Sequence, residues 1–225
     1  MRDRIERDGF ATVPRVFEPD EVALSVEALN DSALRRSRAG VRHALGHPVV
    51  SRIAHAPKLL MLAQEVLGPG AFPFRVTLFD KSPQANWLVV WHQDTALPLV
   101  ERQETPGWGP WSVKDGVIYA HAPASALSRI LALRIHLDDS NAENGPLRVL
   151  PQTHTLGVLS DETIHELARK ISPVDCLVRR GGVLAMRPLL VHSSSKSLGN
   201  ARRRVLHIEF ADSKNLGEGL NLAAA

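Results

Sequence analysis

Hydrophobic and polar positions in the first third of the chain follow a helical period. Apolar residues recur at helical spacing over 19–29 and 57–67; the first stretch opens with acidic residues, and the second ends at Gly68-Pro69-Gly70. Both features are typical of helix ends, so two helices are predicted. A short strand is expected before them, over 7–16, and the polar stretch 30–50 is less decided.

From residue 72 onward the period changes to that of strands. Apolar and polar positions alternate, or short apolar runs lie between turn residues, and one amphipathic helix is expected at 161–168. The predicted strands cover 75–81, 87–94, 130–139, 146–151, 174–178, 183–192 and 203–210. Helices followed by many short strands indicate an α+β chain whose core is a sandwich or barrel of the jelly-roll type.

Two segments carry neither period. Residues 97–128 are rich in Pro, Gly, Trp and charge, and so long a loop in a compact domain is usually a lid or a binding loop. Trp108 and Trp111 argue against disorder there; they are candidates to contact substrate, and packing under the loop is the alternative. The tail 215–225 has no strong pattern and is expected to fray.

Composition narrows the classes of protein. The chain has 225 residues, 44% hydrophobic and 23% charged, which suits one globular domain. Its net charge of +3 comes from scattered Lys and Arg, so no nucleic-acid surface is expected. The single Cys176, the charged N-terminus and the lack of an apolar run of about 18 residues predict a cytoplasmic protein outside membranes.

His43 and His47 lie four residues apart in the 30–50 stretch. On a helix this spacing could bind a metal ion. The nearby glycines and Pro48 argue against a helix, so both are interpreted as solvated loop histidines.

Three other residues could meet at one metal ion. Alternation on the strand 87–94 places His92 and Asp94 on one face and Gln93 on the other. His192 ends the apolar run 183–192, and strands so far apart in sequence can pair in a jelly roll. Two histidines and one carboxylate form the facial set that binds non-haem Fe(II) and leaves positions open.

Arg203 indicates that this site also binds an anionic ligand. On the strand 203–210 it shares a face with His207 and Glu209, and a guanidinium buried in a barrel is costly without an anion. A dicarboxylate bound bidentately by Arg203 would remove that cost. The keto-acid end of such a ligand could occupy two open positions on the iron.

Four stretches match a known family in order: Trp91–Asp94, the block 138–154, Arg187–Ser194 and the arginine-led strand 203–210. They resemble the phytanoyl-CoA dioxygenase-like Fe(II)/2-oxoglutarate oxygenases over nearly the whole chain. The resemblance implies a double-stranded β-helix, a cupin-like jelly-roll barrel with N-terminal helices packed on the major sheet. The expected single domain, 1–225, has a helical part at 17–70, a jelly-roll core at 72–212 and a flexible C-terminal tail.

The resemblance also implies the chemistry. His92, Asp94 and His192 would be the metal ligands, Arg203 the anchor of the 2-oxoglutarate side chain, and Ser194 a helper at that carboxylate. Fe(II), 2-oxoglutarate and O2 would hydroxylate a small organic molecule, with release of succinate and CO2.

Five further residues are candidates with open alternatives. Lys81 could reach the keto-acid end of the cosubstrate or be an exposed lysine at a strand end, and Thr95 could bond near the iron or stabilise a turn. Arg134 stands where some relatives carry an aromatic residue, so it is a candidate contact to cosubstrate or substrate. His121 and His136 could contact substrate or be ordinary hydrogen-bonded histidines.

The competing function is a cupin-like protein that binds a metal or a small acid without oxygen chemistry, as a sensor, isomerase or hydrolase. Arg203 favours the oxygenase, because a simple metal cupin has no use for a buried guanidinium 11 residues after its last ligand. The sequence names neither the substrate nor the oligomeric state.

Overall fold

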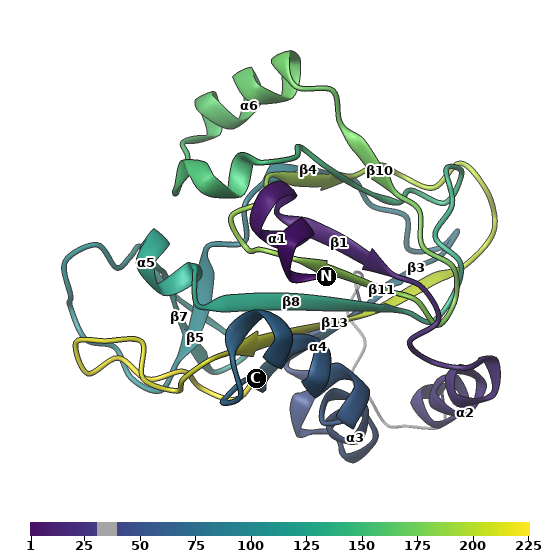
Figure 1. Ribbon diagram of the computed structural model, residues 1–225, viewed down its shortest axis with the longest axis horizontal. Coiled ribbons are helices and arrows are strands. Elements are labelled where there is room, and N and C mark those ends of the chain that lie inside the picture. Colours follow the sequence, from purple (N-terminus) through teal and green to yellow (C-terminus); the bar gives the residue numbers. More distant parts are fainter. Residues whose placement is uncertain (31–39) are drawn as a thin grey trace.

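The computed structural model describes residues 1–30 and 40–225, so part of the 30–50 stretch lies outside the described residues. Within the described part, two antiparallel sheets form the body of the molecule, and a smaller sheet extends from one end (Figure 1). None of the helices described is both long and apolar enough to cross a membrane.

The three sheets are named here by size. The major sheet has the order β1 (Phe10–Val13), β11 (Val183–Met186), β8 (Ile130–His136), β13 (Arg203–Ala211), β3 (Phe72–Lys81), β2 (Gly40–Val41). The minor sheet has the order β10 (Val174–Cys176), β9 (Leu147–Val149), β12 (His192–Ser194), β4 (Val89–His92). The side sheet consists of β5 (Ala96–Leu99), β7 (Val117–His121) and β6 (Trp111–Lys114).

Helices cover the outer face of the major sheet. The helices are α1 (Arg2–Asp8), α2 (Pro19–Asn30), α3 (Pro48–Ala54), α4 (Pro57–Leu67), α5 (Ala124–Leu127) and α6 (Asp161–Lys170), with 3₁₀ turns η1 (Ala44–Gly46) and η2 (Thr153–Leu156). Figure 1 shows α3 and α4 below β8 and β13, whereas α6 lies on the opposite side, by the minor sheet.

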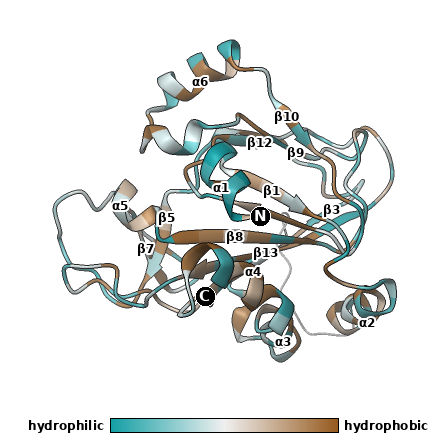
Figure 2. Ribbon diagram, in the orientation of Figure 1, coloured by the Kyte–Doolittle hydropathy of each residue, from teal (hydrophilic) through white to brown (hydrophobic). Residues whose placement is uncertain are grey.

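The strand β8 explains how the two faces of the major sheet differ. All of its residues are buried, and its ribbon is hydrophobic along most of its length (Figure 2). Leu133 and Ile135 belong to the core cluster shared with the helices, whereas Arg134 points into a cavity between the two sheets. Alternation therefore gives the strand an apolar outer face and an inner face that carries Arg134 and His136.

The architecture confirms the predicted α+β fold class and its jelly-roll core. The helix α4 occupies the predicted residues, and α6 begins where the Ser160 hydroxyl accepts a hydrogen bond from the Thr163 amide.

Two helices of the N-terminal part were not predicted from the sequence. Pro48 does not prevent a helix but begins α3, because proline lacks only an N–H that a first helical turn leaves free. The helix α1 was not predicted; it ends at Gly9, whose φ of 86° is a conformation that glycine adopts without strain.

The run 183–192 is two strands rather than one. Residues 183–186 pair with β8 in the major sheet, whereas His192 begins β12 in the minor sheet. Between them the chain turns, with the Leu190 amide bonded to the Arg187 carbonyl. Pro188 supports this break, because proline removes a donor from the ladder.

The segment 97–128 and the C-terminal tail also differ from expectation. The first forms most of the side sheet and α5, and is not an open loop. The tail does not fray: the Ala225 amide bonds to the Phe74 carbonyl at 2.8 Å, and Leu220 and Leu222 are buried in the same cluster as Leu97. The apolar residues of the side sheet and the tail bury one another, which neither stretch could achieve alone.

Candidate metal centre

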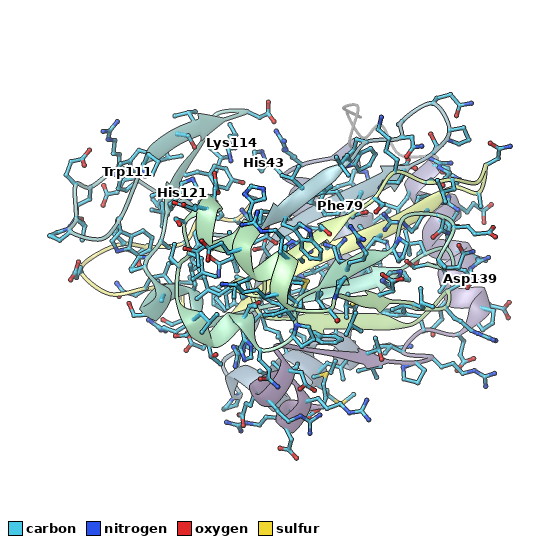
Figure 3. All side chains as sticks on the ribbon, turned by 90° about the horizontal axis from the view of Figure 1, so that it is seen from above. His43, Phe79, Trp111, Lys114, His121 and Asp139 are labelled. Carbon is cyan, nitrogen blue, oxygen red and sulfur yellow. The ribbon has the colours of Figure 1, made fainter. Side chains whose placement is uncertain are left out.

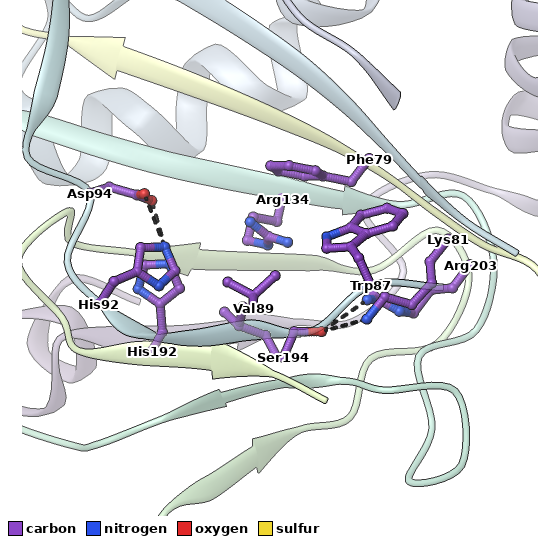
Figure 4. Close-up of a pocket in the computed structure, with 11 residues that line it drawn as sticks. Phe79, Lys81, Trp87, Val89, His92, Asp94, Arg134, His192, Ser194 and Arg203 are labelled. Atoms are coloured by element: carbon purple, nitrogen blue, oxygen red, sulfur yellow. Dashed lines mark hydrogen bonds and ion pairs between the residues drawn. The ribbon is translucent and has the colours of Figure 1, made fainter. Parts of the chain in front are cut away.

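The three predicted ligands lie together at one end of the minor sheet. Strands β4 and β12 are neighbours, with His192 opposite His92, and the ring centroids are 4.2 Å apart. Asp94, just after β4, has one carboxylate oxygen 3.6 Å from His92 Nε2 and the other 3.5 Å from His192 Nε2. Ligand atoms of all three lie within 4.8 Å of one another (Figure 4).

Backbone carbonyls orient both imidazoles. His92 Nδ1 lies 2.8 Å from the Val90 carbonyl and His192 Nδ1 lies 2.8 Å from the Leu190 carbonyl. Each Nδ1–H therefore donates to its own strand, which leaves the Nε2 lone pair directed at the shared centre. This arrangement is the usual support for a metal-binding histidine.

The charges of the three groups also suit a cation. Burial and the neighbouring His92 lower the pKa of His192 to about 4, so that imidazole is neutral. Burial acts against it, yet His192 and His92 hold the pKa of Asp94 well below its usual value. Burial acts against it, yet Asp94 raises the pKa of His92, which reflects the negative charge that a cation would neutralise. Two ring nitrogens and one carboxylate oxygen fit an Fe(II) site.

Gln93 holds this strand in place from its other face. Its side-chain amide donates to the Leu189 carbonyl at 2.7 Å and to the Gly157 carbonyl at 2.9 Å, and its oxygen accepts from the Leu159 amide. The prediction that Gln93 points away from the metal and satisfies backbone groups is confirmed.

A cavity of about 140 Å³, called the inner cavity here, extends from the metal ligands between the two sheets. The ligands lie at one end, and Lys81, Ser194 and Arg203 lie at the other (Figure 4). Its remaining lining consists of Phe79, Trp87, Val89, Arg134 and Leu147.

The far end of the inner cavity is cationic. Arg203 donates to the Asn144 carbonyl at 3.1 Å and to Ser194 Oγ at 3.4 Å, while Lys81 donates to Ser194 Oγ at 3.1 Å and to the Ser195 carbonyl at 2.6 Å. Within residues 1–30 and 40–225, neither cation has a carboxylate partner. Burial and the nearby Arg134 lower the pKa of Arg203 to about 10, and burial and Arg203 lower the pKa of Lys81 to about 8.

Lys81 is buried, so the alternative of an exposed lysine at a strand end is wrong. Strand β3 pairs Lys81 directly with Arg203, and both line the end of the inner cavity opposite the metal ligands. The turn at Asn144 and Gly145 closes this end. A Cβ on Gly145 would lie 2.3 Å from the Ser195 carbonyl oxygen, so only glycine fits there.

Arg134 lies between the two ends of the inner cavity. Its Nη1 donates to His207 Nδ1 at 2.8 Å, and its guanidinium lies 5.2 Å from the centre of the Phe79 ring. Burial lowers the pKa of Arg134, and no acidic side chain of the described residues pairs with it.

Three other predicted candidates lie outside the inner cavity. Thr95 Oγ1 and His121 Nδ1 form a hydrogen bond with each other at 2.6 Å. His136 is buried, and its two ring nitrogens have no hydrogen-bond partner among the described residues.

Trp108 and Trp111 do not line the inner cavity that contains the metal ligands. Both are partly buried against the cluster beneath the side sheet. Figure 3 shows Trp111 and His121 on the side-sheet part of the molecule, away from Phe79.

A second cavity, the outer cavity, was missed by the sequence reasoning. It measures about 210 Å³ and touches the metal site through Asp94. It is lined by Arg42, His43, Arg75, Thr77, Phe79, Asp94, Lys114, Tyr119, His207 and Glu209. His43 is not a free loop residue, since its Nε2 is 2.8 Å from the Tyr119 hydroxyl. Part of this lining could have been found from the sequence, because alternation along β3 places Arg75, Thr77 and Phe79 on one face of the strand.

Comparisons with known proteins agree with this geometry. The family model for phytanoyl-CoA dioxygenase (PhyH) matches residues 5–205. The L-proline trans-4-hydroxylase of Streptomyces griseoviridis is 26% identical, over 92% of this chain and 84% of that protein. The ectoine dioxygenase of Bordetella parapertussis is 27% identical, over 66% of this chain and 47% of that protein.

Solved structures share the fold. EctD from S. alaskensis with 2-oxoglutarate and 5-hydroxyectoine has a TM-score of 0.71 at 21% identity, covering 93% of this chain and 74% of that one. AviO1 from Streptomyces viridochromogenes Tue57 has a TM-score of 0.67 at 24% identity, covering 93% of this chain and 92% of that one. These findings do not favour the alternative of a cupin without oxygen chemistry. The chain belongs to the phytanoyl-CoA dioxygenase family, and it is an oxygenase that uses Fe(II), 2-oxoglutarate and O2.

Proposed function

We propose that this oxygenase hydroxylates a small organic metabolite and converts 2-oxoglutarate to succinate and CO2. One observation carries the proposal: a 2-His-1-carboxylate set lies at one end of a cavity, and at the other end lie two buried cations that have no carboxylate partner among the described residues. A molecule with a keto-acid end and a second carboxylate matches both ends. The names of the relatives, a proline hydroxylase and an ectoine dioxygenase, support a small-molecule substrate.

The proposed roles follow the geometry. His92, Asp94 and His192 hold Fe(II), and Arg203 binds the distal carboxylate of 2-oxoglutarate with help from Ser194. When bound, Fe(II) supplies the oxidation chemistry, in which one oxygen atom of O2 enters a substrate C–H bond and the other enters succinate.

Lys81 and Arg134 complete the cosubstrate site in this proposal. Lys81 shares Ser194 with Arg203 and so adds its charge to the distal carboxylate. Arg134 lies over Phe79 along the length of the cavity. The dry walls formed by Trp87, Val89 and Leu147 strengthen these charge interactions, because they exclude water.

The biological setting is also a proposal. The single Cys176 and the ordinary charge support a cytoplasmic enzyme. The shared packing of helices and both sheets supports one domain over residues 1–225.

An anaerobic titration tests the function. Fe(II) and 2-oxoglutarate together should produce a weak visible charge-transfer band, and 2-oxoglutarate at 100 times its Kd should raise the free energy of unfolding by about 2.7 kcal/mol. The variant His92→Ala should lose the band. The variant His165→Ala, which removes an exposed histidine from α6, should keep it. Metal-loaded protein without band or stabilisation would contradict the proposal.

A further inference from the structure

The outer cavity adjoins the inner cavity at Asp94. The two cavities share Asp94 and Phe79, and the hydrogen bond between Arg134 and His207 forms part of the wall between them. A molecule in the outer cavity would therefore approach the metal without entering the space assigned to 2-oxoglutarate.

The far rim of the outer cavity is built from segments distant in sequence. Arg42 follows β2, Lys114 ends β6, and Tyr119 lies on β7. Figure 3 shows Lys114 and His43 close together above the strands of the body, and both line this cavity. The hydrogen bond between His43 and Tyr119 fixes two more polar groups beside them.

The charges in the outer cavity do not balance. Glu209 is 2% exposed and binds the Arg75 guanidinium through both oxygens, so these two charges cancel. Asp94 faces the metal site. Arg42 and Lys114 remain, and within the described part of the chain neither forms an ion pair; Asp115 lies near His43 but pairs with neither cation.

The two cations also repel each other. Partial burial, Arg42 and Arg75 lower the pKa of Lys114. The side chains of Arg42 and Lys114 are exposed at the rim, and the Lys114 ammonium lies 5.0 Å from the centre of the Tyr119 ring. An anionic group between Arg42 and Lys114 would relieve this repulsion and form charge-assisted hydrogen bonds.

We propose that the substrate is a small molecule with an anionic oxygen group, a carboxylate or a phosphate, held by Arg42 and Lys114 at the rim of the outer cavity. This inference rests on the proposed function and names the substrate class of the same site. The rim fixes the anion, and the remainder of the molecule extends toward Asp94 and the metal. The His43–Tyr119 pair positions the anion by donating a hydrogen bond beside the two cations.

Matched pairs of compounds test the charge. Carboxylic acids such as L-proline are compared with their amides, and sugar phosphates with the free sugars, in the enzyme loaded with Fe(II) and 2-oxoglutarate. The measured quantity is substrate-stimulated release of succinate. At least one acid or phosphate should stimulate it at least tenfold more than its neutral partner, and the arm that responds identifies the anion.

Variants test the residues. Arg42→Gln and Lys114→Gln should each raise the KM for the stimulating anion by about 10- to 100-fold, the value of one charged hydrogen bond. The kcat, the affinity for 2-oxoglutarate and the anaerobic charge-transfer band should stay unchanged. Arg169→Gln, which removes an exposed arginine at the end of α6, is the matched control and should change none of these quantities.

The outcomes separate the two proposals. A protein that forms no charge-transfer band and releases no succinate contradicts the proposed function itself. The protein could instead form the band but be stimulated equally by the neutral partners, by neutral compounds only, or by none of the anions. Any of these results contradicts the anionic substrate and leaves the proposed function intact. An unchanged KM in both variants overturns the anionic substrate as well.

Discussion

Replacing Lys81 with Met should stabilise the protein without cosubstrate and weaken its binding of 2-oxoglutarate. Lys81 is 2% exposed, and burial together with Arg203 lowers its pKa from 10.5 to about 8. Because a tenfold change in proton affinity is about 1.4 kcal/mol, keeping this lysine charged in the fold costs about 3 kcal/mol. Met fills a similar volume without the charge.

The net gain is smaller than this cost. The Lys81 ammonium donates to the Ser195 carbonyl at 2.6 Å, and losing that hydrogen bond costs about 1 kcal/mol. The Ser194 hydroxyl keeps its bond to the Gly145 carbonyl. The free energy of unfolding measured with urea at pH 7 should therefore rise by about 2 kcal/mol in Lys81→Met, while the affinity for 2-oxoglutarate should fall by about 10- to 100-fold, as expected for one charged contact.

The stability of the protein should also depend on the titration of Lys81. Between pH 8 and 10.5 the unfolded chain keeps a proton on Lys81 that the folded chain has lost, so the stability of the wild-type protein should rise with pH across this window. The affinity for 2-oxoglutarate should fall across the same window, because the neutral amine no longer attracts a carboxylate. Both trends should vanish in Lys81→Met. A variant that is less stable than wild type, or that binds 2-oxoglutarate equally well, would refute this reasoning.

Three further predictions concern other parts of the fold. Arg203→Met should weaken 2-oxoglutarate binding by about 10- to 100-fold in calorimetry, whereas Arg203→Lys should recover part of the loss, since it restores the charge without the bidentate geometry. Glu209→Gln should lower the free energy of unfolding by about 3–5 kcal/mol in a urea titration, because Arg75 loses its buried carboxylate partner; a loss below 1 kcal/mol would contradict the pairing. Leu220→Ala should cost about 2–5 kcal/mol in the same measurement, whereas a fraying tail would tolerate it.

Alternation was the strongest signal in the sequence. It predicted which residues of β8 and β13 face inward, and so it placed Arg134 and Arg203 in the interior between the sheets. It also predicted the shared face of His92 and Asp94. These predictions depend on the twofold period of a strand, which is a local property of the backbone.

The remaining features depend on how distant segments meet. No local pattern shows that the run 183–192 divides between two sheets, yet that division brings His192 opposite His92. Arg42 and Lys114 come from two stretches without any period, and their approach to Asp94 depends on how the side sheet packs. The ordering of the tail likewise requires a partner surface that its own sequence does not contain.

The wall between the two cavities explains how so many cations can lie close to one metal. Arg134 donates to His207 Nδ1, which must therefore carry its proton on Nε2, and that nitrogen lies 3.8 Å from Glu209 Oε2. Burial and Arg134 hold the pKa of His207 well below its ordinary value, so the imidazole is neutral. Glu209 in turn binds Arg75. Along the wall, the cation Arg134 is followed by the neutral His207 ring, the anion Glu209 and the cation Arg75. Both carboxylate oxygens of Glu209 bind Arg75. Among the described residues, this wall therefore offers no free carboxylate to Arg203 on one side or to Arg42 on the other, which supports the proposal that an anionic ligand binds in each cavity.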